Sequence, residues 1–167
     1  MEDYSRSFFI IILLRTSKKI TLTNVAEFKK KLLLWAQQFD EIVWLDSNNY
    51  PQKYSSFEVV LAVDAYTSLK SEHINAFDKL KKYKNQTQDF IFGHLSYDLK
   101  NNIENLSSKN DDGLQFPELY FFQPKKLFII KKGVLEIKYL KVYENEIESD
   151  LGEISNQNLI LKQVKYD

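Results

Sequence analysis

The chain has 167 residues, no cysteine, and 23 basic side chains against 23 acidic ones. A chain of this length can bury one self-sufficient core, and its 44% hydrophobic and 14% aromatic content excludes a disordered protein. The lack of cysteine excludes disulfides and thiolate metal sites and suits a reducing compartment, with the cytoplasm as the default. The zero net charge provides no overall field for a polyanion, so we expect a single domain over residues 1–167 without a nucleic-acid partner.

The most apolar stretch, residues 8–14, is much shorter than the roughly 20 apolar residues that span a membrane. It follows acidic residues and precedes no small-residue cleavage site, so we expect neither a signal peptide nor a membrane span. Its β-branched and aromatic content predicts a buried strand instead.

Two amphipathic patterns predict helices. Apolar residues recur at spacings of three and four from Val25 to Phe39, after Thr23 or Asn24 as a cap. A lysine-rich pattern predicts a surface helix over about residues 71–83, and a helical turn is expected within 98–106.

The other patterned runs predict strands, two of them joined by a hairpin turn at residues 131–133. A polar loop is expected at 107–113. We therefore expect an α+β domain with a largely antiparallel, sandwich-like sheet and a few amphipathic helices packed on it. Beyond residues 8–14, the predicted strands are 42–45, 57–63, 90–97, 118–122, 127–130 and 134–140, with weak strand character at 159–164.

A search for catalytic and metal-binding groups finds little. The two histidines, His73 and His94, have no neighbouring ligands at metal-binding spacing, and no glycine-rich phosphate loop is present. Only Arg6 and Arg15 could provide the bidentate fork that usually clamps carboxylates. The sequence therefore predicts no catalytic residue and no metal site in this chain.

Two segments contain residue types that a hydrophobic core alone does not require. Leu45-Asp46-Ser47 ends a predicted strand, and the next strand begins with Tyr54, Ser55 and Phe57. Hydroxyls beside aromatic rings would form a small concave site for an amine or carboxylate with an apolar body. The second segment, residues 90–98, has Gly93 inside a bulky strand, which indicates close approach of another backbone.

Together these segments resemble the N-terminal half of component I of the chorismate-utilising amidotransfer enzymes, the anthranilate and aminodeoxychorismate (para-aminobenzoate) synthases. The resemblance covers about residues 42–140 and is closer to the aminodeoxychorismate branch. Four short elements carry it, in the family's order and spacing: Leu45-Asp46-Ser47, Tyr54 to Ala62, Gly93 to Asp98 continuing through Ile103-Glu104, and Phe116-Pro117-Glu118.

The resemblance implies that this chain contains no catalytic residue. In the family, the Mg²⁺-binding glutamates and the chorismate contacts belong to a C-terminal half, and we expect this chain to stop before it. The N-terminal half packs against that half and against the glutamine amidotransferase subunit, component II. It also houses a tryptophan pocket, which by position would be lined by Leu45, Ser47, Tyr54, Ser55 and Phe57. Many relatives have arginine where this chain has Ser56.

Three alternatives remain open at this stage. The chain could be the N-terminal domain of an anthranilate synthase component I, or a stand-alone module that binds an aromatic amino acid such as tryptophan. It could also be a structural interaction domain whose resemblance to the family is fortuitous. In the leading interpretation, we further expect the surface around Phe90, Phe92, Tyr120 and Phe122 to include positions that a partner domain covers.

Overall fold

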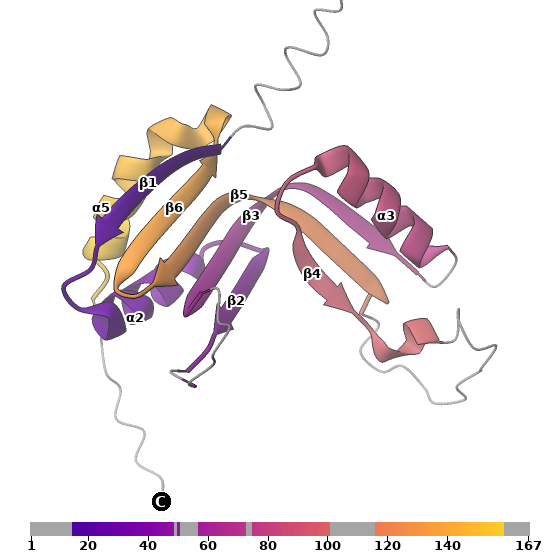
Figure 1. Ribbon diagram of the computed structural model, residues 1–167, viewed down its shortest axis with the longest axis horizontal. Helices are drawn as coiled ribbons and strands as arrows, with labels where there is room; N and C mark the ends of the chain where they lie inside the picture. Colours follow the sequence, from indigo (N-terminus) through magenta and orange to yellow (C-terminus); the bar gives the residue numbers. More distant parts are fainter. Residues whose placement is uncertain (1–14, 49, 51–56, 73–74, 101–115, 159–167) are drawn as a thin grey trace, which may run out of the picture.

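The computed structural model describes residues 15–48, 50, 57–72, 75–100 and 116–158. In this part of the chain, six strands form one antiparallel sheet in the order β1-β6-β5-β3-β2, and β4 also pairs with β5. Helices pack on the sheet, so the predicted α+β class is confirmed (Figure 1). The strands are β1 (Arg15–Thr21), β2 (Ile42–Asp46), β3 (Val59–Ser71), β4 (Phe92–Leu95), β5 (Leu119–Lys131) and β6 (Val134–Leu140); the helices are α2 (Val25–Ala36), α3 (Ala76–Thr87) and α5 (Ile147–Ser155), with the 3-10 helices η1 (Tyr97–Lys100) and η2 (Lys141–Glu146).

The two central strands, β3 and β5, are 13 residues long and bend together near their middle (Figure 1). The register between them shifts between Ala65 and Thr67, which leaves Tyr66 as an extra residue in β3. Asp64 has a φ of 63°, and Pro124, which lacks an N–H, lies opposite Ala65. A bulge of this kind bends a strand and interrupts its ladder.

The bend divides the sheet into two arms. The first arm contains β1, β2, β6 and the adjoining ends of β3 and β5, namely residues 59–63 and 126–131. The second arm contains β4 with residues 65–71 of β3 and 119–124 of β5. Both β6 and β4 therefore pair with the same edge of β5, one in each arm.

α3 and α5 lie on the outer side of the bend (Figure 1), and α2 shares a buried cluster with α5 on the same face of the first arm. α2 and α5 cover the first arm, where Trp35 and Ile154 pack with Phe128 and Ile137 in the largest buried cluster. α3 covers the second arm through Ala76, which packs with Leu119 and Leu99. Alternation of side chains is broken at the bend, because Lys125 and Lys126 both point to this outer side: Lys125 pairs with Asp64, and Lys126 with Asp150 of α5.

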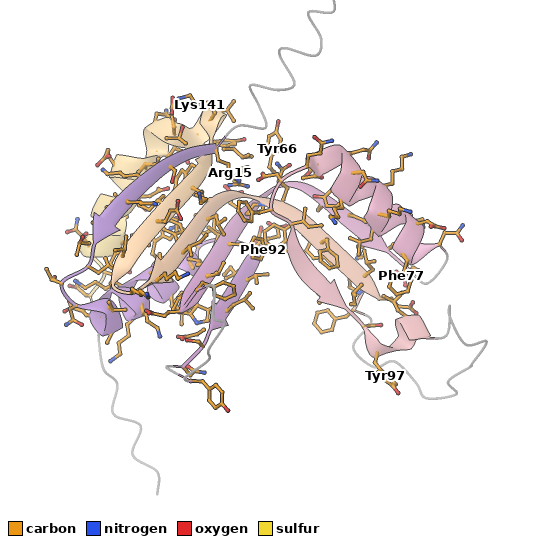
Figure 2. The ribbon with its side chains drawn as sticks, in the orientation of Figure 1. Arg15, Tyr66, Phe77, Phe92, Tyr97 and Lys141 are labelled. Atoms are coloured by element: carbon orange, nitrogen blue, oxygen red, sulfur yellow. The ribbon has the colours of Figure 1, made fainter. Side chains whose placement is uncertain are left out.

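The inner side of the bend is apolar, and we call it the open face. Four buried residues at its centre pack with half-buried residues from both arms, and none of these belongs to a described helix. Figure 2 shows Phe92 on this inner side and Tyr66 on the outer side. The open face consists of Val60, Ala62, Phe122 and Leu127 with Val43, Phe57, Ala65, Phe92, Tyr120 and Ile129 around them, and Leu45 beside Val60.

The structure confirms some predicted elements and corrects others. The first helix has Asn24 as its cap, the side chain of which accepts a hydrogen bond from the Glu27 N–H, and the hairpin at 131–133 forms. The second helix was placed too early: β3 continues through Ser71, and α3 begins only at Ala76. The strands predicted at 118–122 and 127–130 are one strand, β5.

Neither β1 nor α5 was predicted. β1 reads Arg-Thr-Ser-Lys-Lys-Ile-Thr at the edge of the sheet, with only one apolar residue, so it lacks an apolar pattern. In α5, Ile147, Leu151 and Ile154 have helical spacing, but Gly152 and three acidic residues obscure it. The predicted strands at 8–14 and 159–164 and the loop at 107–113 lie outside the described residues.

Candidate functional site

The open face gathers several of the residues that the sequence marks as a ligand site. Leu45 lies directly opposite Val60 in the β2–β3 ladder, so both side chains are on this face. Leu45 is 43% exposed, and the half-buried Phe57 packs against the cluster. Ser47 is half-buried just after β2, and its N–H donates to the Glu58 carbonyl at 2.8 Å. Tyr54 and Ser55 lie outside the described residues.

An ion pair holds the end of β2 in place. Lys29 of α2 lies 2.6 Å from the Asp46 carboxylate, which also accepts a hydrogen bond from the Asn48 N–H at 2.9 Å. Burial by itself raises the pKa of Asp46, but the hydrogen bonds from Lys29 and Asn48 outweigh it and hold that pKa below its usual value. The charged Asp46 therefore anchors Leu45 and Ser47 on either side of it.

The sequence elements around Gly93 and Glu118 also meet in space. Gly93 of β4 lies opposite Phe121, and a Cβ added at Gly93 would be only 1.9 Å from the Tyr120 carbonyl oxygen. This is the close approach that a glycine within a bulky strand predicts. Beyond the strand, the Ser96 N–H donates to the Glu118 carbonyl at 2.7 Å, which joins the Gly93 element to the Phe116-Pro117-Glu118 element.

The expected aromatic surface is only partly exposed. Phe90 is 44% exposed, Phe92 and Tyr120 are half-buried, and Phe122 is 2% exposed. Phe122 is therefore a core residue and does not belong to an exposed patch, because it fills the angle between the two arms. Burial, and then the neighbouring Glu41 carboxylate, raise the pKa of Tyr120, whose hydroxyl donates to Glu41 at 3.4 Å.

A buried ion pair that was not predicted lies at the bend. Arg15 of β1 donates from Nε and Nη2 to the Asp89 carboxylate, at 2.8 to 3.0 Å, and its Nη1 and Nη2 also donate to backbone carbonyls. The Gln123 amide donates to the same carboxylate at 2.7 Å. The only sequence signal for this ion pair was the scarcity of arginine, because Arg15 is one of just two arginines in the chain. A cavity of about 550 Å³ beside this pair is lined by Lys84, Asn85, Gln88, Asp89 and Phe90.

A second buried cluster lies under α5. Lys126 contacts Asp150 at 2.6 Å and Glu146 at 2.8 Å, and the Tyr139 hydroxyl donates to Asp150 at 2.7 Å. Burial opposes the charge on Lys126, but these hydrogen bonds outweigh it and raise its pKa. Burial, followed by the Asp150 hydrogen bond, raises the pKa of Tyr139. All these groups are therefore partnered within the cluster.

The described residues contain no group of three histidine, aspartate or glutamate side chains that could hold a metal ion. His94 contacts the Pro117 carbonyl at 3.1 Å through Nε2, and His73 lies outside the described residues. Within the described part of the chain, every helix is too short or too polar to cross a bilayer.

Comparison with known proteins adds no assignment: no family model and no curated protein matches this chain. The functional interpretation therefore depends on the four sequence elements and on how the fold brings them together. They meet as two pairs, one at the end of β2 and one between β4 and β5.

Proposed function

We propose that this chain is the N-terminal, non-catalytic domain of an aminodeoxychorismate synthase component I. The parent enzyme would aminate chorismate with glutamine-derived ammonia on the route to para-aminobenzoate and folate. The observation that carries the proposal is the spatial pairing of the four elements. The Ser47 N–H donates to the Glu58 carbonyl just before β3, and the Ser96 N–H donates to the Glu118 carbonyl, so backbone hydrogen bonds join the elements in each pair.

In this proposal, the open face is where the C-terminal chorismate-binding domain packs. The face is apolar, it lies between two arms, and no described helix covers it. Leu45 leaves 43% of its surface exposed there, which a partner domain would bury. The Mg²⁺ site and the chorismate contacts belong to that partner domain, and component II delivers ammonia to it, all in the cytoplasm.

A binding experiment tests this role. The purified chain is mixed with the separately expressed chorismate-binding half of an aminodeoxychorismate synthase component I, and the complex is detected by analytical ultracentrifugation. We expect Leu45→Glu to weaken the complex at least tenfold, because it buries a charge against apolar surface. Leu33→Glu is the matched control, since Leu33 is 39% exposed on α2, away from the open face. Equal effects of both substitutions would contradict the docking role.

A second experiment tests the absence of chemistry. The chain alone, given chorismate, ammonia and Mg²⁺, should form no aminodeoxychorismate, and adding the chorismate-binding half should give product. Product formed by the chain alone would overturn the assignment of catalysis to the other half.

One observation favours a second candidate, a module that binds an aromatic amino acid. Leu45 and Phe57 both lie on the open face and offer an apolar surface to an indole ring. Calorimetric titration with tryptophan distinguishes the two candidates, because the module must bind without a partner domain. No heat at millimolar tryptophan, with the fold verified by circular dichroism, excludes it. An anthranilate synthase origin would instead appear as anthranilate formation when the chain is combined with the catalytic half of that enzyme.

A further inference from the structure

We propose that Arg15 and Asp89 form a brace that sets the angle between the two arms and thereby the width of the open face. Arg15 and Asp89 are positioning residues in this proposal. Only the identity of what enters the open face rests on the proposed function; the brace is a property of the chain itself.

The brace occupies a notch in the sheet. β6 pairs with residues 126–131 of β5, and β4 pairs with residues 119–122, so residues 123–125 of β5 face a gap between the two strands. The Arg15 guanidinium fills this gap. Its Nη2 donates to the Pro124 carbonyl at 2.6 Å, and its Nη1 to the Lys138 carbonyl at 3.0 Å, with Lys125 O at 3.5 Å. Arg15 thus takes the hydrogen-bonding place of a missing strand segment.

The partner of Arg15 comes from the opposite arm. Arg15 begins β1 in the first arm, whereas Asp89 lies between α3 and β4 in the second arm. Their side chains are 8% and 6% exposed, and Arg15 also lies over the Phe90 ring at 5.8 Å. Because the guanidinium is a rigid planar fork, it can reach both the carboxylate and the β5 carbonyls only over a narrow range of arm angles. Figure 2 shows Arg15 at the start of β1, beside the bend.

Other ion pairs near the bend do not link the arms in this way. Lys125 and Asp64 are 2.9 Å apart, but both belong to the central strands that run through both arms. Lys126 and Asp150 are as deeply buried as the brace, at 6% and 9% exposure, yet lie wholly within the first arm and its helix. The second pair is therefore a matched control, equal in burial but not in position.

A distance measurement across the bend tests the proposal. The chain has no cysteine, so spin labels can be attached at introduced cysteines alone. Lys30→Cys on α2 and Lys81→Cys on α3 place one label on each arm, at exposed positions. Lys30→Cys with Asn145→Cys in η2 places both on the first arm. Pulsed electron–electron double resonance then gives the distribution of distances between the two labels, with and without the brace.

We expect Arg15→Gln and Asp89→Ala each to change the distribution of label distances across the bend. Either its mean should move by more than the width of the parent distribution, or its width should exceed that of the parent chain. The distribution within the first arm should not change. Lys126→Met should lower stability but leave both distributions unchanged. If Arg15→Gln does not fold, Arg15→Lys replaces it, because an ammonium group can pair with Asp89 but cannot reach the β5 carbonyls at the same time.

Two results would overturn the brace: an unchanged distribution across the bend in the folded brace variants, or an equal change caused by Lys126→Met. Neither result touches the docking role of the open face, because no partner domain takes part in the measurement. Conversely, if Leu45→Glu behaves like Leu33→Glu in the binding experiment, the docking role fails while the brace stands.

Discussion

The buried cluster under α5 allows a stability prediction worked from its contacts. In Lys126→Met, the new side chain keeps the length of the buried stem, so little cavity forms. The Asp150 carboxylate, whose side chain is 9% exposed, keeps only the Tyr139 hydroxyl as a partner. Removing one member of a buried ion pair costs about 3 to 5 kcal/mol, because a buried charge remains uncompensated. The contacts of the ammonium group with the Trp35, Phe39 and Tyr139 rings, at 5.4 to 5.6 Å, are lost as well.

Urea unfolding followed by tryptophan fluorescence measures this cost. Trp35 is 1% exposed and packs against the cluster, so its emission reports on the same region. We expect Lys126→Met to lower the free energy of unfolding by about 4 kcal/mol with an unchanged m-value. The melting temperature should fall by about 10 °C.

Adding Asp150→Leu and Tyr139→Phe to Lys126→Met removes the remaining unpaired polar groups and should recover most of the lost stability, since apolar groups often replace a buried ion pair at no cost. If Lys126→Met lowers the free energy of unfolding by less than about 1 kcal/mol, or if the triple variant does not recover stability, the cluster is hydrated rather than buried.

Two further predictions concern β4 and alkaline pH. Gly93→Ala should lower the free energy of unfolding by about 2 to 4 kcal/mol, because its Cβ would collide with the β5 backbone and disrupt the short β4–β5 ladder and its packing. Amide hydrogen exchange should accelerate selectively in β4. Gly152→Ala is the control: with open space around it in α5, it should gain about 0.5 to 1 kcal/mol. Since the folded-state pKa values of Lys126 and Tyr139 are raised, the folded chain holds these protons more tightly, so stability should fall as pH rises above about 10. Tyr139→Phe should make that fall shallower in urea titrations at pH 9 to 11, and an equal slope would contradict the role of Tyr139.

Local patterns in the sequence were enough for the elements with a clear period. The apolar spacing in α2, the Asn24 cap and the hairpin around Gly133 depend on residues a few positions apart, so each is visible without the rest of the chain. The same holds for Gly93, because a glycine among bulky residues signals a close contact wherever it occurs. The α+β class followed from counting such elements.

The candidate site was predictable only in part. Leu45 and Phe57 could be placed on neighbouring strands because few residues separate them. Both do lie on one face, Leu45 through the β2–β3 ladder and Phe57 just before β3 begins at Val59. The burial of Phe122 could not be foreseen, since it depends on the angle between the arms. β1 was missed because an edge strand with polar side chains has no apolar alternation to reveal it.

What the sequence alone determined is therefore the α+β class, the elements with a clear apolar period, and some of the turn and cap residues that begin or end them. Only the tertiary structure decided the bend, because a bulge at Tyr66 opposite Pro124 arises from pairing between strands about sixty residues apart. It also decided the Arg15–Asp89 pair, whose members are 74 positions apart in the chain. Contacts at that separation carry no local pattern; they exist because the folded sheet leaves a notch that a guanidinium group can fill.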